Sequence, residues 1–294
     1  MANKIDLHIH TIFSDGAYTP KEVIDMAFEN GVDTIAISDH DTIDAYTDTL
    51  FEYAKSKGIN LISGVEISTK YNGFGIHVLG YNIDLKNQKL QDCLNMLKNA
   101  RKDYLKNVSV VLNKLGYKLN VDKLSECPSV TKAHIAIDVV TNIENKELLL
   151  KTFGHIPQKG EFIEAIMNEG CVGYVEKYTI TPVQASKIIK EANGKVVLAH
   201  PVAYMWVDGV SYNELDSLIK EMQADGVEAN YLYVDKYDNL VNESECWCKY
   251  CEENNLLSTI GSDFHNIDGI RPTIGFKNYD FHGRNVDVKK LLSK

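Results

Sequence analysis

Short apolar segments that end in histidine or a carboxylate recur along this 294-residue chain, and they constrain its fold more than any other feature. The first is DLHIHTIFSDG, residues 6–16, which places His8, His10 and Asp15 close together. Side chains two positions apart on a strand point to the same side, so His8 and His10 should face one site. Gly16 allows a tight turn that can bring the Asp15 carboxylate back over the strand end.

Later strands repeat this arrangement in the segments TIAISDHD, NLISGVEIS, GIHVLGYNI, KVVLAHP and LLSTIGSDFH. The side chains that they deliver are His40, Glu66, His77, His200, Asp263 and His265. We expect helices between these strands, three of them opened by capping boxes, at 19–31, about 43–58, 181–194, 211–226 and about 238–254. Strands that alternate with helices and end in polar groups indicate a (β/α) barrel with its site at the carboxyl ends of the strands.

Imidazole nitrogens and carboxylate oxygens together form a ligand set for divalent ions such as Zn, Mn or Fe. Taken alone, Glu66 and His77 are more readily interpreted as structural groups. Six of the nine histidines, however, lie on these strands or at their ends, which favours one shared metal site. The candidate ligands exceed what a single ion needs, so we expect two or three ions, with the two oxygens of Glu66 able to bridge a pair.

The character of the chain changes between residues 85 and 170, where amphipathic helical patterns replace strands. We interpret 1–84 and 171–294 as the metal-binding barrel, and 85–170 as a helical insertion that forms a lid over the barrel mouth. Most charged side chains on such a segment are expected to be solvated.

The net charge of −10 argues against a large surface for nucleic acid, although a small positive pocket stays possible. The chain shows neither a signal-peptide pattern nor an apolar stretch long enough to span a membrane. Six cysteines in such a chain suggest reduced thiols in the cytoplasm. Cys246, Cys248 and Cys251 could belong to a zinc knuckle, but their spacing on a helix favours ordinary free thiols.

The motifs DLHIHTIFSDG, ISDHDT, GVEIS, IHVLGY, VLAHP and IGSDFH resemble those of the PHP (polymerase and histidinol phosphatase) family of metal-dependent phosphoesterases. The resemblance implies a distorted (β/α)₇ barrel with a trinuclear site. It assigns the first ion to His8, His10, Glu66 and Asp263, the second to Glu66, His77 and His200, and the third to Asp15, His40 and His265. In such a site a hydroxide held between two ions would attack phosphorus and expel the leaving group.

The helical insertion resembles that of the monomeric bacterial branch, whose enzymes act on nucleoside 3′,5′-bisphosphates and on the 5′ ends of short RNA or DNA. By this resemblance Arg101, Lys132 and His134 are candidates for binding substrate phosphate. The segment TKAHIAID has Lys132 and Ile137 where that branch carries arginines, which separates this chain from the usual pattern.

Two alternatives stay open at this point. One is a histidinol-phosphate phosphatase, which would share the metal site and differ in its pocket. The other is a metal-binding regulatory protein without turnover.

Overall fold

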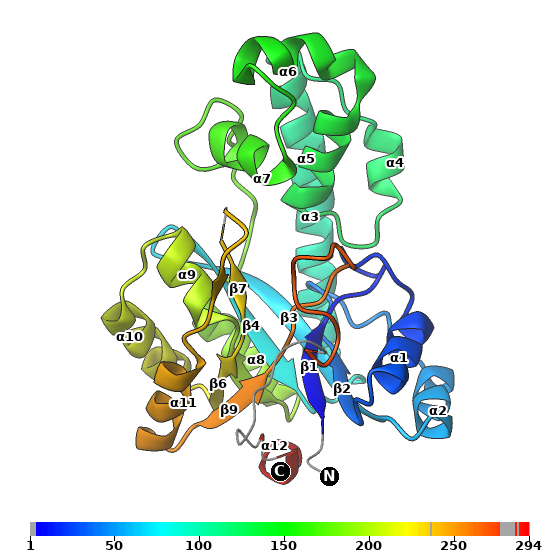
Figure 1. Cartoon of the computed structure of the whole chain (residues 1–294), viewed down its shortest axis with the longest axis vertical. Coiled ribbons are helices and arrows are strands. Elements are labelled where there is room, and N and C mark those ends of the chain that lie inside the picture. Colours follow the sequence, from blue (N-terminus) through cyan, green and yellow to red (C-terminus); the bar gives the residue numbers. More distant parts are fainter. Residues whose placement is uncertain (1–3, 236, 277–285, 287, 294) are drawn as a thin grey trace. The chain divides into compact units, whose positions relative to one another are not determined.

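The structure is a computed structural model that describes residues 4–235, 237–276, 286 and 288–293. The chain divides into two compact units, which are described separately: Met1–Leu94 with Ile180–Lys294, and Asn95–Thr179 (Figure 1). This division by contacts lies at 94/95 and 179/180, and helix α3 (Gln88–Lys114) runs across the first of these points. The expected domain boundaries at 84/85 and 170/171 stay a prediction.

The first unit is built on a seven-stranded sheet of order β1-β2-β3-β4-β5-β6-β9. Its strands are β1 (Ile5–Ile9), β2 (Thr34–Ile37), β3 (Asn60–Tyr71), β4 (Phe74–Tyr81), β5 (Lys195–Leu198), β6 (Gly226–Asn230) and β9 (Leu257–Ile260). The sheet curls until its two edges meet, since the His10 N–H donates to the Phe264 carbonyl at 2.9 Å and Ile9 bridges Phe264. The predicted distorted (β/α)₇ barrel is confirmed.

Strand β4 departs from a simple alternation of strands and helices. It pairs antiparallel with both β3 and β5, whereas the other neighbouring strands of this sheet run parallel. A two-residue turn joins β3 to β4, and both of its residues, Asn72 and Gly73, have positive φ angles of 49° and 93°. Asn-Gly is a favoured pair for such a hairpin turn, so the local sequence carries the signal for this reversal.

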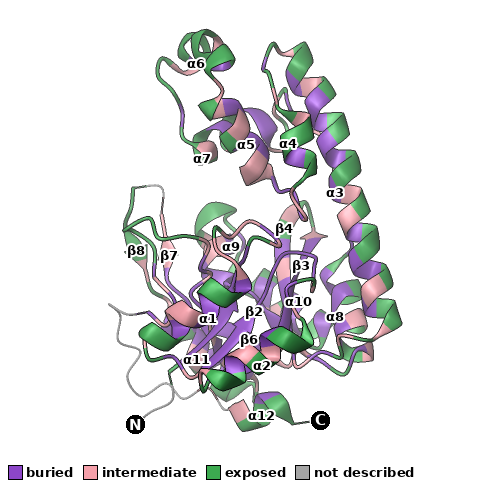
Figure 2. Ribbon diagram, turned by 90° about the vertical axis from the view of Figure 1, so that its right-hand side faces the viewer, coloured by how far each residue is buried: buried purple, intermediate pink, exposed green. Residues whose placement is uncertain are grey.

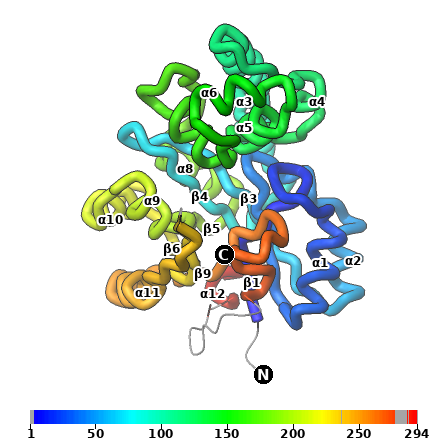
Figure 3. Tube along the Cα trace, turned by 45° about the horizontal axis from the view of Figure 1, so that its top comes forward, coloured from blue at the N-terminus to red at the C-terminus, as the bar shows by residue number. Residues whose placement is uncertain are grey.

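Helices cover the outside of the sheet, with α1 and α2 on one side and α10 and α11 on the other (Figure 3). The helices of this unit, besides the start of α3, are α1 (Pro20–Glu29), α2 (Asp48–Ser56), α8 (Pro182–Glu191), α9 (Pro201–Val207), α10 (Tyr212–Met222), α11 (Ser244–Glu253) and α12 (Val288–Leu292). The predicted capping boxes of α1, α8 and α10 are all present, with Thr19, Thr181 and Ser211 as caps.

Two expectations about these helices were wrong. Helix α2 begins at Asp48 rather than near residue 43, because the Thr47 side chain accepts the Leu50 N–H and caps it there. Helix α11 begins at Ser244 rather than near 238, because the hairpin of β7 (Tyr233–Val234) and β8 (Leu240–Val241) precedes it. Helix α9, which the sequence analysis did not include, starts at Pro201, because proline suits the first helical turn.

The second unit contains only helices. They are most of α3, then α4 (Val121–Ser125), α5 (Lys132–Thr141), the 3₁₀ turn η1 (Ile143–Asn145), α6 (Lys146–Phe153), α7 (Lys159–Phe162) and the π-helical η2 (Ile163–Met167). Leu112, Ile135 and Phe162 belong to its own buried core. Figure 2 shows buried strands in the first unit and a buried stripe along α3. No described helix is both apolar enough and long enough to cross a membrane.

Candidate metal centre

The nine predicted ligands all belong to the first unit, where the barrel brings them together. His8 lies on β1, Glu66 on β3 and His77 on β4, within the strands themselves. The others follow strand ends: His10 and Asp15 after β1, His40 after β2, His200 after β5, and Asp263 and His265 after β9. Strands β1 and β2 are buried throughout and β3, β4 and β5 for most of their length, so the polar groups converge at the end of an apolar barrel.

Glu66 is the centre of this arrangement and is fully buried. Each of its oxygens faces a different group of histidines. Oε2 lies 3.3 Å from His8 Nε2, 3.3 Å from His10 Nε2 and 2.9 Å from His40 Nδ1, while Oε1 lies 2.9 Å from His77 Nδ1 and 3.1 Å from His200 Nε2. A carboxylate contacted on both oxygens in this way has the geometry of a bridging ligand.

Two further carboxylates flank the histidines. Asp263 Oδ1 is 3.1 Å from His10 Nε2 and 3.5 Å from His8 Nε2. Asp15 Oδ1 is 3.2 Å from His265 Nε2, and its Oδ2 is 3.8 Å from His40 Nε2. In the part of the chain that the structure describes, three groups place ligand atoms within 4.8 Å of one another: His10–Asp15–His40–His265, His8–His10–Glu66 and His40–Glu66–His77.

The chemistry of these donors fits divalent ions. His8 Nε2 and His10 Nε2 face each other at 3.1 Å, and two imidazole lone pairs this close repel unless a hydrogen or a cation lies between them. Glu66 Oε2 and Asp15 Oδ1 are buried and make no hydrogen bond, although nitrogens lie close to both. Buried polar atoms of this kind need a partner, and the cluster could hold divalent metal ions.

Charge in the cluster shifts the pKa values of its members strongly. Burial alone would raise the pKa of Glu66, but the charges of His40, His77 and His8 outweigh it and hold that pKa well below its usual range. Burial opposes a charge on His10, yet the neighbouring carboxylates of Asp263 and Glu66 raise its pKa to about 10. Burial lowers the pKa of His40 to about 4. The cluster thus keeps its carboxylates ionised, as metal ligands must be.

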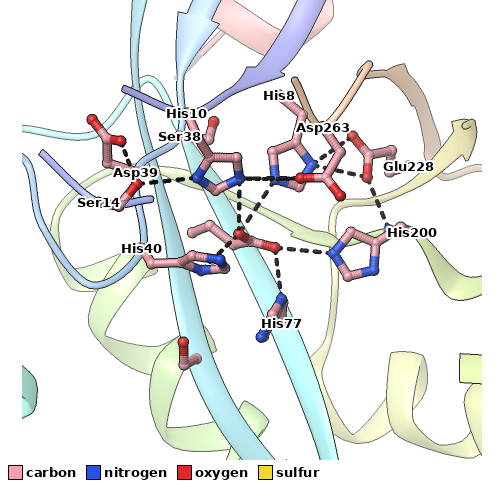
Figure 4. Close-up of polar contacts among 12 residues, drawn as sticks. His8, His10, Ser14, Ser38, Asp39, His40, His77, His200, Glu228 and Asp263 are labelled. Atoms are coloured by element: carbon pink, nitrogen blue, oxygen red, sulfur yellow. Dashed lines mark hydrogen bonds and ion pairs between the residues drawn. The ribbon is translucent and has the colours of Figure 1, made fainter. Parts of the chain in front are cut away.

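Two supporting carboxylates were missed by the sequence reasoning (Figure 4). Both oxygens of Glu228, on β6, lie close to His8 Nδ1, at 3.0 and 3.1 Å. Asp39 accepts hydrogen bonds from the Thr11 N–H and from the Ser14 hydroxyl, and Ser14 Oγ lies 3.3 Å from His10 Nδ1. A signal for Glu228 existed, because the tripeptide Gly-Val-Glu opens its strand and also carries Glu66.

The three candidate phosphate-binding residues lie in the second unit. Arg101 is buried there, and its Nη1 donates to the Val130 carbonyl at 3.1 Å. Lys132 Nζ donates to Asn168 Oδ1 at 3.2 Å. His134 Nδ1 accepts the Thr131 N–H at 3.2 Å and so helps to cap α5, a structural role that the motif did not indicate. Their role in binding substrate stays a prediction.

All six cysteines are free thiols. Of the three on α11, Cys246 is exposed and Cys251 is buried, while Cys248 Sγ lies 3.4 Å from Ser258 Oγ. Their different surroundings agree with ordinary helical cysteines.

Known proteins resemble this chain over most of its length. Residues 6–193 match the family model described as PHP domain. The 5′-3′ exoribonuclease of Haemophilus influenzae is 31% identical over 267 residues, which cover 90% of this chain and 91% of that protein. The 3′,5′-nucleoside bisphosphate phosphatase of Chromobacterium violaceum is 26% identical over 269 residues, covering 90% and 88%.

A solved structure shares the fold. It is a Bifidobacterium adolescentis protein provisionally described as a metal-dependent phosphoesterase. It superposes with a TM-score of 0.74 at 23% identity, over 99% of this chain and 96% of that one.

Proposed function

The chain belongs to the PHP domain family of metal-dependent phosphoesterases, and we propose that it hydrolyses phosphate monoesters of nucleotides. The observation that carries the proposal is Glu66, a buried carboxylate with five histidines around its two oxygens. Such a cluster is costly to bury unless it binds cations. Its place at the carboxyl ends of barrel strands is where barrel enzymes have their active sites.

We assign the ligands to two or three ions, with manganese, iron or zinc as candidates. Glu66 would contribute an oxygen to each of two ligand sets. His8, His10 and Asp263 would complete the first set, and His77 and His200 would complete the second. Asp15, His40 and His265 would hold the third. When bound, such ions acidify a water molecule and neutralise charge on the phosphoryl oxygens.

The protein's own groups then have defined tasks. Glu66 fixes the spacing of the ligand sets, because its two oxygens are joined rigidly and face different histidines. The Tyr231 hydroxyl donates to Asp263 Oδ2 at 3.3 Å, which leaves Oδ1 directed at His8 and His10. The buried surroundings exclude water from these contacts and strengthen them.

A nucleotide is the substrate class best supported. The two relatives above are named for action on RNA and on nucleoside 3′,5′-bisphosphate. The net charge of −10 disfavours a long polyanion, so we propose a nucleoside 3′,5′-bisphosphate or the 5′ end of a short oligonucleotide. We further propose that the protein acts as a monomer in the reducing cytoplasm, where its six free thiols would persist.

The test is release of inorganic phosphate or mononucleotide, with Mn²⁺, Fe²⁺ and Zn²⁺ tried in turn. The substrates are adenosine 3′,5′-bisphosphate, short 5′-phosphorylated RNA and DNA, histidinol phosphate and p-nitrophenyl phosphate. Turnover of one nucleotide well above the others, abolished in Glu66→Gln, is the expected result. A preference for histidinol phosphate, or binding of metal with no hydrolysis, would contradict the proposal and support one of the two alternatives named above.

A further inference from the structure

We infer that Glu228 is a positioning residue that aims His8 and His200 at the metal centre together, and thereby sets the affinity of two ligand sets at once. The inference rests on the proposed function, because it concerns the metal site of that proposal. Glu228 contacts His8 at Nδ1 and His200 at its backbone N–H, whereas the Nε2 atoms of both histidines point at Glu66. Its contacts are therefore those of a residue that supports ligands.

The contact with His8 fixes which ring nitrogen carries hydrogen. Glu228 is almost fully buried, and both of its oxygens face His8 Nδ1, at 3.0 and 3.1 Å. An ionised carboxylate only accepts hydrogen bonds, so Nδ1 must be the protonated nitrogen. When the ring is neutral, as metal binding requires, its lone pair lies on Nε2, which points at Glu66 Oε2 and Asp263 Oδ1. Carboxylate, histidine and metal in series is a common way to orient a ligand.

The contact with His200 holds a strained stretch of backbone. The His200 N–H donates to Glu228 Oε2 at 2.9 Å. His200 has a φ angle of +23°, which is unfavourable for a residue with a side chain. In this conformation its Nε2 lies 3.1 Å from Glu66 Oε1. Figure 4 shows Glu228 between His8 and His200, on the side away from His10.

The neighbouring strand leaves room for this carboxylate. A Cβ atom at Gly261, which follows β9, would overlap Glu228 Oε1 and the Cβ of His8. Glycine at this position therefore permits the contact between Glu228 and His8. The room left by Gly261, the hydrogen bonds to His8 and His200, and the burial of Glu228 all support its role as a positioning residue.

The experiment compares Glu228→Gln with the wild-type protein, using Mn²⁺ as the probe and electron paramagnetic resonance to separate free from bound metal. Glutamine has nearly the same shape but is uncharged, and an NH₂ group in place of Oε1 would face the His8 Nδ1–H as a second donor rather than as an acceptor. Losing a supporting carboxylate of this kind costs about 10–100-fold in metal affinity, and we expect the dissociation constant to rise by that factor. Activity lost at low Mn²⁺ should return as Mn²⁺ is raised, which a merely structural defect would not produce.

Asp225→Asn is the matched control. Asp225 lies next to the start of β6, and its Oδ2 accepts the Val196 N–H at 2.8 Å without contacting any ligand. Its Mn²⁺ affinity should equal that of the wild type. Equal affinity in folded Glu228→Gln would overturn the inference and leave the proposed function intact, whereas absence of Mn²⁺ binding in the wild type would overturn both.

A second measurement needs no variant. In Zn²⁺-loaded wild-type protein, ¹⁵N spectra of histidine side chains distinguish a protonated ring nitrogen from a metal-bound one. The inference predicts that His8 carries hydrogen on Nδ1 and metal on Nε2. A metal-bound Nδ1 at His8 would overturn it, even if Glu228→Gln failed to fold.

Discussion

The hydroxyl of Tyr46 occupies the place where strands β2 and β3 part, just before they deliver His40 and Glu66. Regular pairing of the two strands ends at Ile37 and Ser63. Beyond it, the Ile37 N–H donates to the Tyr46 oxygen at 3.0 Å and the Gly64 N–H donates at 2.8 Å. The two chain segments contact each other again where the Glu66 N–H donates to the Asp39 carbonyl at 3.2 Å.

Tyr46→Phe removes the acceptor from both N–H groups, and Ile37 and Gly64 are buried. Each buried donor left without a partner costs about 1–3 kcal/mol, so the two together should lower the free energy of unfolding by about 2–6 kcal/mol. Gly64 cannot move closer to the partner strand, since its α-carbon already lies so near the Ile37 carbonyl that a Cβ would meet it. The loss should therefore not be recovered by simple closing of the gap.

Urea unfolding followed by tryptophan fluorescence measures the free energy of unfolding of the unit that contains Tyr46. The chain has two tryptophans, Trp206 and Trp247, and both belong to the barrel unit. The control is Tyr53→Phe, which removes a hydroxyl bonded to the partly exposed Asp25, and it should cost about 1 kcal/mol or less. A loss below about 1 kcal/mol in Tyr46→Phe would refute the reasoning that the hydroxyl replaces strand pairing.

Three further predictions concern the site, the insertion and the thiols. His8→Ala should lose bound metal and activity together, and full metal occupancy by elemental analysis would exclude His8 as a ligand. Lys132→Ala should weaken nucleotide binding by about 1.5–3 kcal/mol, the strength of a charge-assisted hydrogen bond, and leave metal content unchanged. Unaltered kinetics on all nucleotides in an Arg101→Ala, Lys132→Ala double variant would remove the insertion from substrate binding. All six cysteines should react with a thiol reagent after denaturation without reductant, and a Cys246–Cys251 disulfide would contradict the proposed compartment.

The barrel and the convergence of the candidate ligands were predictable because their determinants are local. A strand presents alternate side chains to one face, so His8 and His10 had to point the same way. Capping boxes such as Thr19 with Glu22 mark helix starts within four residues of sequence. The reversal of β4 was not predicted, although the Asn72-Gly73 pair is a strong local signal for a hairpin turn.

The supporting groups depend on contacts between distant parts of the chain. Glu228 and His8 are 220 positions apart, and the local sequence around either residue does not indicate that the two are in contact. Asp39 directly precedes His40 in the sequence, yet its partners are Thr11 and Ser14 on another loop. Sequence reasoning thus identifies groups that a strand end delivers, but it does not identify the groups that hold them in place.

The most direct test of the central claim is a titration of chelator-stripped protein with Mn²⁺, in which bound metal and phosphate release from adenosine 3′,5′-bisphosphate are measured in the same samples. The account predicts no hydrolysis without metal, and activity that rises with occupancy until two or three ions are bound. Hydrolysis that is undiminished in the stripped protein would contradict it. So would saturated metal binding without hydrolysis of this substrate or of a short 5′-phosphorylated oligonucleotide.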